Sequence, residues 1–229
     1  MPIYNLSEEP LFPPADLADK DGLLAVGGDL KPQRLLNAYA AGIFPWYSEG
    51  QPILWWSPDP RMVLFPEKFR RHKNLRRIID KDIFTFSFDQ EFAKVICYCS
   101  TVNRQNQEST WITEEMKEAY INLHKKGYAH SVETYSNGKL VGGLYGVSIG
   151  RIFFGESMFH LKSDASKVAL WHLADFCLKN GIQIIDVQQN TSHLKSMGAE
   201  IISRKNFLTL LKENMSTASI TGDWNAFSN

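Results

Sequence analysis

Residues 130–159 read HSVETYSNGKLVGGLYGVSIGRIFFGESMF, and this stretch decides the fold. It holds three runs with the composition of β-strands, His130–Tyr135, Leu140–Val147 and Ile152–Phe159. Asn137-Gly138 between the first two runs is a strong hairpin turn, and Ser148-Ile149-Gly150 joins the second run to the third. The sequence therefore predicts an antiparallel meander of three strands.

Helices are predicted on both sides of this meander. Apolar residues recur at i, i+3, i+4 and i+7 in three sets: Phe92, Val95, Ile96 and Cys99; Met116, Ala119, Tyr120 and Leu123; and Leu170, Leu173, Ala174 and Cys177. We expect a strand at about 83–88, another within 182–189, a short helix at 190–198, and a last strand. The resulting order resembles the GCN5-related N-acetyltransferase fold. We therefore expect an α+β (mixed α/β) protein whose C-terminal domain is acetyltransferase-like.

The first 62 residues differ in composition from the rest of the chain. Residues 1–30 contain six acids, and the segment 42–61 contains three tryptophans and four prolines. Pro32 starts a short helical pattern, but the other prolines and Gly27-Gly28 break longer elements. We predict a small, loop-rich N-terminal domain at 1–62 and the acetyltransferase-like domain at 63–229. The polar tail at 216–229 is expected to be frayed.

Composition excludes several classes of protein. The 25 Lys and Arg residues equal the 25 Asp and Glu residues, so net charge gives no indication of a polyanionic partner. The chain lacks an 18-residue apolar run, and MPIYNLSEEP has neither a basic leader nor an apolar segment, which argues against a membrane span or secretion. The three cysteines and six histidines lack the spacing of metal ligands. We expect a cytoplasmic protein without a metal.

Polar side chains interrupt two apolar strands. Glu156 lies in FFGESMF, and Asp186 and Gln188 lie in IIDVQQ. Side chains two residues apart share one face of a strand, with Cα atoms about 6.6 Å apart, so Asp186 and Gln188 are expected to project together. A buried carboxylate is costly unless it is paired. Two interpretations stay open: a site that holds a substrate amine or water, or carboxylates satisfied by backbone amides or a basic side chain.

A basic cluster follows the aromatic segment. Six of the ten residues from 68 to 77 are basic: Lys68, Arg70, Arg71, Lys73, Arg76 and Arg77. Such a run is either a solvated helical face or a surface that follows a nucleic-acid backbone. Trp46, in a loop bounded by Gly and Pro, is the better candidate for stacking on a base, whereas Trp55 and Trp56 are expected in the core.

Common catalytic motifs do not occur in the chain. There is no GxSxG nucleophile elbow, no GxxxxGK[ST] phosphate loop and no GxGxxG. The glycines of GGLYG at 142–146 fit close approach of backbones in a sheet.

Several long blocks, taken together, resemble the leucyl/phenylalanyl-tRNA–protein transferase family. They run in order over residues 22–188: GLLAVGGDL (22–30), AYAAGIFPWYS (38–48), PILWWSPDPR (52–61), TWIT (110–113), AHSVE (129–133), LVGGLYGV (140–147), FFGESMF (153–159), SDASKVAL (163–170) and IIDVQ (184–188). WWSPDPR and GESMF are long and unusual, so the resemblance is far more specific than the one at the level of the fold.

The resemblance implies a reaction. The family transfers Leu or Phe, and less readily Met, from charged tRNA to the α-amino group of proteins that begin with Arg or Lys. The new N-terminus marks the protein for N-degron degradation. The donor is aminoacyl-tRNA, so no coenzyme A or other cofactor and no metal is expected. We expect a monomer, because the site for charged tRNA must stay accessible.

The resemblance also implies roles for individual residues. Asp186 and Gln188 match the family's catalytic pair, with Glu156 close by, and the expected role of Gln188 is to contact the attacking amine. Trp46 and Trp111 match tryptophans that flank the terminal adenosine.

Leu144, Phe153 and Leu173 match the apolar pocket for the aminoacyl side chain. Relatives carry Met at 144 and Phe at 173, so the ranking of donors is open. The cluster from Lys68 to Arg77 matches the tRNA-contacting region in type, and less well in position.

Two other functions are possible. An acetyltransferase that uses acetyl-CoA would need a [QR]xxGx[GA] turn before Lys167, where the chain instead reads FHLKSDASK. A non-catalytic RNA-binding module would explain the basic cluster and the tryptophans, but not Glu156, Asp186 and Gln188.

Overall fold

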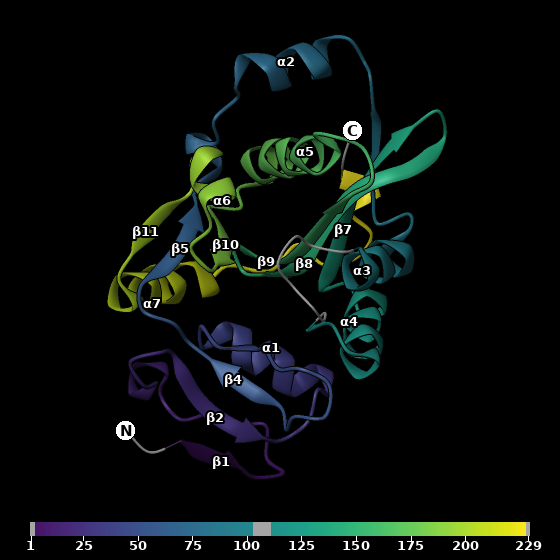
Figure 1. The fold of residues 1–229 in the computed structure, drawn as a ribbon. Helices are drawn as coiled ribbons and strands as arrows, with labels where there is room; N and C mark the ends of the chain where they lie inside the picture. Colours follow the sequence, from purple (N-terminus) through teal and green to yellow (C-terminus); the bar gives the residue numbers. More distant parts are fainter. Residues whose placement is uncertain (1–2, 103–110, 228–229) are drawn as a thin grey trace.

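The protein consists of two β-sheets and the helices that accompany them (Figure 1). The structure is a computed structural model that describes residues 3–102 and 111–227. Thr110 of the TWIT block lies outside these ranges. The first sheet has the strand order β1-β2-β4-β3, formed by Tyr4–Leu6, Leu23–Gly27, Leu54–Trp56 and Phe44–Pro45. The 3-10 helix η1 (Ala15–Leu17) and α1 (Pro32–Ala40), with proline in its first turn, accompany it. The sequence predicted α1 but not this sheet, because its strands are five residues or shorter.

The second sheet contains the predicted meander. Its order is β11-β5-β10-β9-β8-β7-β6, formed by Glu200–Ile202, Arg61–Leu64, Ile184–Gln188, Ile152–His160, Lys139–Ile149, Ala129–Ser136 and Thr85–Phe88. Strands β7 to β9 form the expected antiparallel meander, β6 pairs antiparallel with β7, and β10 pairs parallel with β9. The strand β5 was not predicted.

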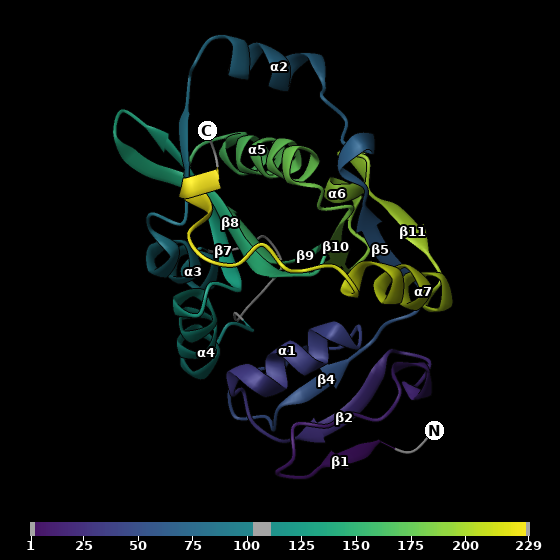
Figure 2. The same cartoon turned by 180° about the vertical axis from the view of Figure 1, so that it is seen from behind.

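Helices cover both faces of the second sheet. The helix α5 (Ala165–Asn180) packs on one face, while α3 (Phe92–Thr101) and α4 (Glu114–Lys125) pack on the other. All three were predicted, and the side-chain oxygen of Thr113 caps α4 by accepting from the Met116 N–H at 3.2 Å. The 3-10 helix η2 (Pro66–Lys68) leads into α2 (Lys73–Asp80), which lies outside α5, as both views show (Figures 1 and 2). The α+β fold with the acetyltransferase-like order of elements is confirmed.

The C-terminal segment differs from the expectation. The helix α7 (Arg204–Met215) follows the short α6 (Ser192–Ser196) and β11, and it was not predicted. The expectation of a frayed tail is wrong for Trp224, which begins η3 (Trp224–Phe227) and is fully buried. Its indole stacks on His130 and Phe176, with ring centroids 4.0 and 4.2 Å away. Burial of one large aromatic ring outweighs the polar character of its neighbours.

The two sheets share one hydrophobic core. Tyr39 of α1 lies in the same buried cluster as Tyr120 of α4 and Phe154 of β9. The chain leaves the first sheet at Trp56 and enters the second at Arg61. The domain division at residue 62 stays a prediction. The shared core brings α1 against the centre of the second sheet.

The parallel pair of strands separates near its end. β9 and β10 pair from Ile152 and Ile184 to Phe154 and Asp186. Beyond these residues β9 continues to His160, whereas β10 has a register shift between Asp186 and Gln188. The backbone pairing of β9 with β10 therefore ends two residues before Glu156 and Gln188.

Candidate active site

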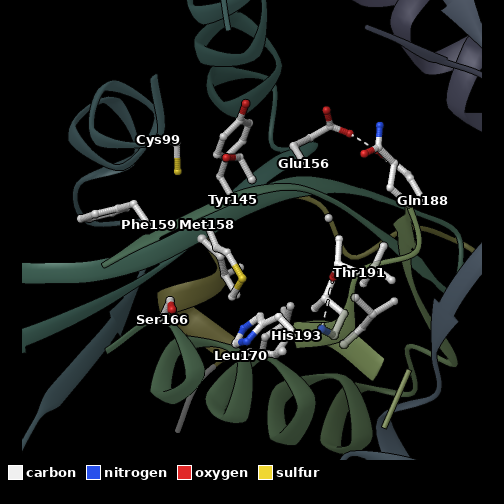
Figure 3. Close-up of a pocket in the computed structure, with 18 of the residues that line it drawn as sticks. Cys99, Tyr145, Glu156, Met158, Phe159, Ser166, Leu170, Gln188, Thr191 and His193 are labelled. Atoms are coloured by element: carbon white, nitrogen blue, oxygen red, sulfur yellow. Dashed lines mark hydrogen bonds between the residues drawn. The ribbon is translucent and has the colours of Figure 1, made fainter. Parts of the chain in front are cut away.

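A cavity of about 840 Å³ lies where β9 and β10 separate. β9, β10, the first turns of α5, α6 and the loop around Trp46 line it. Figure 3 shows Glu156 and Gln188 together at one side of the cavity, and Met158 and His193 farther along it. The cavity is large enough for a small organic group, and its lining combines apolar side chains with polar ones.

Glu156 accepts three hydrogen bonds from three separate elements. The Tyr39 hydroxyl of α1 donates to Oε1 at 2.8 Å, and the Tyr120 hydroxyl of α4 donates to Oε2 at 2.9 Å. The side-chain amide of Gln188 donates to Oε1 at 3.0 Å. The two tyrosine hydroxyls also contact each other. The carboxyl group is therefore held in one orientation at the edge of the cavity.

Burial changes the protonation of this cluster. Burial raises the pKa of Glu156 to about 7, even though the hydrogen bonds from Tyr39, Tyr120 and Gln188 oppose the rise. Burial also raises the pKa of both tyrosines, and the nearby charge of Glu156 adds to it, so both hydroxyls stay protonated as donors. Near neutral pH, Glu156 can therefore both accept and release a proton.

Gln188 reaches Glu156 because the strand bulges. Its φ of 61° is in the left-handed region, where the register of β10 against β5 shifts. The regular alternation expected for Asp186 and Gln188 is wrong, since the bulge lies between them. The Gln188 side chain lines the cavity and that of Asp186 does not, but the Gln188 N–H donates to Asp186 Oδ1 at 3.0 Å.

Asp186 forms a fully buried ion pair with Arg61. The guanidinium donates from Nε to Oδ1 at 2.9 Å and from the terminal NH2 nitrogen to Oδ2 at 2.7 Å. Arg61 also lies over the rings of Phe44 and Phe207, and its guanidinium carbon Cζ is 4.9 and 4.5 Å from the two ring centroids. The sequence left two interpretations of Asp186 open, a substrate-binding group or a carboxylate satisfied within the protein. The structure supports the second, because a basic side chain and a backbone amide satisfy this carboxylate.

The structure gathers the other predicted pocket residues at the same cavity. Leu144, Phe153 and Leu173 line it and are almost fully buried. Trp46 and Trp111 also line it and are partly exposed, while Trp55 is fully buried, as expected. Contacts with an aminoacyl side chain or an adenosine stay predictions.

The basic cluster lies elsewhere. None of its six residues lines the cavity; Lys68 pairs with Glu200 at 2.9 Å, and Arg71 pairs with Asp175. The other four are exposed and have no acidic partner among residues 3–102 and 111–227: Arg70, Lys73, Arg76 and Arg77. These four form a solvated basic surface on α2 and the residues before it.

Sequence reasoning missed three residues of the site. Tyr120 appeared only as a member of an apolar helix stripe, Tyr39 only within the block at 38–48, and Arg61 as the last residue of a block. A tyrosine in an apolar stripe is a usable signal, because a buried hydroxyl needs a hydrogen-bond partner. Arg61 carried no comparable signal, because its partner is 125 residues away.

Within the described ranges, no group of His, Cys, Asp and Glu side chains is arranged to hold a metal ion. Every helix in the described part of the chain is too short or too polar to cross a bilayer.

A carboxyl group with a pKa near 7, an amide beside it and an adjoining cavity fit a site for acid–base chemistry such as acyl transfer. The Leucyl/phenylalanyl-tRNA protein transferase family matches residues 63–212, and its N-terminal domain matches residues 28–59. The chain belongs to this family, and it is an aminoacyltransferase.

Relatives match over nearly the whole chain. A leucyl/phenylalanyl-tRNA–protein transferase of Syntrophobacter fumaroxidans is 59% identical over 94% of this chain and 92% of its own length. One from Myxococcus xanthus is 54% identical over 98% of this chain and 97% of its own length. Among solved structures, a GCN5-related N-acetyltransferase from Kribbella flavida has a TM-score of 0.39 at 10% identity, covering 78% of this chain and 63% of that one. A likeness that distant says nothing about activity.

Proposed function

We propose that this chain transfers leucine or phenylalanine, and less readily methionine, from charged tRNA to proteins that begin with Arg or Lys. The new peptide bond forms on the α-amino group and marks the acceptor for N-degron degradation. The reaction takes place in the cytoplasm on a monomer. The observation that supports this most is the hydrogen bond between Gln188 and Glu156, beside an apolar cavity.

The proposed reaction is the attack of an amine on an ester. The amine nitrogen attacks the carbonyl carbon, a C–N bond forms, and the C–O bond to the ribose breaks. The proton that leaves the nitrogen finally resides on the ribose oxygen. Glu156 takes the proton. Its pKa of about 7 is similar to the ordinary pKa of an α-amino group, about 8, so the transfer costs little free energy.

Gln188 orients the amine. One hydrogen of its amide is donated to Glu156, so its carbonyl oxygen is the group that accepts from the amine N–H. Asp186 acts through Gln188: its charge is balanced by Arg61, and it holds the Gln188 backbone N–H at 3.0 Å. Asp186 is therefore a positioning residue in this proposal, and the substrate contacts Glu156 and Gln188.

The pH dependence of transfer tests the role of the tyrosines. The rate should rise as pH increases through about 7, because Glu156 must be deprotonated to act as the base. Tyr120→Phe removes a hydrogen bond that favours the carboxylate, so the midpoint in kcat/KM should move up by about one pH unit.

Tyr135→Phe is the matched control, because its hydroxyl contacts Ser87 and not Glu156. Identical midpoints for Tyr120→Phe and the unaltered chain would contradict the assignment of Glu156 as the base.

We propose that Trp46 and Trp111 hold the terminal adenosine and that Leu144, Phe153 and Leu173 hold the aminoacyl side chain. Their position around one cavity with Glu156 supports this arrangement. Phosphates of the acceptor stem lie farther away, against the exposed basic surface that includes α2.

Charge reversal on α2 should weaken tRNA binding. In the double variant Arg76→Glu with Arg77→Glu, the slope of log Kd against the logarithm of the salt concentration should become shallower by about one for each phosphate that the protein no longer neutralises. Filter binding of charged tRNA between low and moderate salt measures this slope. Lys205→Glu on α7, an exposed lysine far from α2 in the chain, is the control. An unchanged slope would remove α2 from the binding surface.

The choice of donor tests the proposed function. Purified protein is given an Arg-initiated peptide with leucyl-tRNA, phenylalanyl-tRNA or acetyl-CoA. We expect label to reach the peptide from both charged tRNAs. Acetylation of the peptide without aminoacylation would favour an ordinary acetyltransferase instead.

A further inference from the structure

A second polar cluster lines the cavity, and the reaction above does not use it. His160 ends β9, Lys167 lies in the first turn of α5, and His193 lies on α6. All three line the same cavity as Glu156 and Gln188. Figure 3 shows His193 across the cavity from these two residues. Three basic side chains from three elements therefore converge on the end of the cavity away from the proposed reaction centre.

The members of this cluster affect one another's charge. Partial burial of the His193 ring lowers its pKa, and its electrostatic interactions with Lys167 and His160 lower it further. The acidic group that faces them is Asp164, whose Oδ1 lies 2.6 Å from Lys167 Nζ. The hydrogen bond from Lys167 lowers the pKa of Asp164, and the charge of His160 also lowers it.

The ion pair between Asp164 and Lys167 is partly solvated. Their side chains are 30% and 37% exposed, and exposed pairs of this kind contribute little to stability. The ammonium of Lys167 can therefore turn toward an anion in the cavity at small cost. His160 and His193 are exposed at their own positions and need no large rearrangement to donate.

The spacing along β9 indicates what the ligand spans. Glu156 and His160 are four residues apart on β9, and four residues of a strand extend about 13 Å. The register of β9 against β8 shifts at Glu156, so this side chain turns to Tyr39 and Tyr120, whereas Met158 packs with the residues of α5. Two groups that far apart cannot act on one carbonyl carbon. They fit the two ends of one extended ligand, with a reacting ester at Glu156 and an anionic group at His160.

We infer that His160, Lys167 and His193 bind the terminal phosphodiester of the donor RNA strand, an inference that rests on the proposed function. A phosphodiester carries one negative charge and accepts charge-assisted hydrogen bonds from lysine and imidazole N–H groups. The exposed cations of α2 do not line the cavity, so they contact phosphates farther along the strand. The cavity thus binds the donor at the side chain, the ester and the last phosphate.

Two minimal donors isolate this contact. One is the leucyl ester of adenosine, and the other is the leucyl ester of adenosine 5′-methylphosphate, which adds a single phosphodiester charge. With an Arg-initiated peptide as acceptor, the unaltered chain should prefer the phosphate-bearing donor by roughly tenfold in kcat/KM. The double variant Lys167→Met with His193→Gln should reduce this preference to nearly one.

Lys195→Met is the matched control, because this exposed lysine lies on α6 but does not line the cavity. The control should keep the tenfold preference. A preference that survives in the double variant, or equal use of both donors by the unaltered chain, would overturn the inference while leaving the proposed function intact. Transfer from neither minimal donor nor leucyl-tRNA would overturn both.

Discussion

Glu156→Gln should lower the kcat of aminoacyl transfer by about 10²- to 10⁴-fold, the usual contribution of a general base. The substitution keeps the size of the side chain and an oxygen that accepts from a tyrosine, but it removes the group that takes the proton. Single-turnover transfer from leucyl-tRNA to an Arg-initiated peptide measures the loss directly. The remaining rate should also lose its dependence on pH near 7, because the group that titrates there is gone.

Glu118→Gln on α4 controls for loss of a carboxylate in general. This residue is exposed and lies two positions before Tyr120, so its helix is the one that supports the site. It should transfer at the normal rate. If Glu156→Gln kept a kcat within about twofold of normal, Glu156 could not be the base, since even a weak base contributes about a hundredfold.

Arg61→Met should cause the largest loss of stability of any single change at the site. It leaves the Asp186 carboxylate fully buried without its cation, and breaking a buried pair from one side costs about 3–5 kcal/mol. For a chain of this size the melting temperature should fall by roughly 6–20 °C. Thermal and urea unfolding followed by circular dichroism measure the change.

Two further variants separate the ion pair from the site. Replacing both partners, Arg61→Met with Asp186→Leu, should restore most of the free energy of unfolding, because no unpaired charge remains. Transfer should stay impaired, since the Gln188 N–H then lacks its acceptor. Lys68→Met, which breaks the exposed pair with Glu200, should change stability by less than about 1 kcal/mol. Normal stability of Arg61→Met would contradict this account of Asp186.

Local patterns predicted the elements that carry strong local signals. The helix α4 was predicted from its apolar stripe, and the structure shows in addition a Thr113 cap and acidic residues in its first turn. The strands β7, β8 and β9 follow from their composition and the Asn137-Gly138 turn. The short strands of the first sheet and β5 gave no such signal, because their pairing is decided by contacts distant in sequence.

The site was predictable only in part for the same reason. Glu156 and Gln188 were noticed because polar residues are costly in apolar strands. Their contact depends on the bulge at Gln188, which regular alternation does not predict. Tyr39 and Tyr120 are 81 residues apart, and only the packing of α1 on the second sheet brings both to Glu156.

The most direct test of the central claim is transfer of radiolabelled leucine from charged tRNA to two peptides, one beginning with Arg and one with Gly. We expect label on the Arg peptide alone, and no label after prior treatment of the donor with RNase. Equal labelling of both peptides would contradict the proposed acceptor. If no label reached either peptide while the tRNA still bound, the chain would instead be an RNA-binding module, and the proposed role of Glu156 and Gln188 would be wrong.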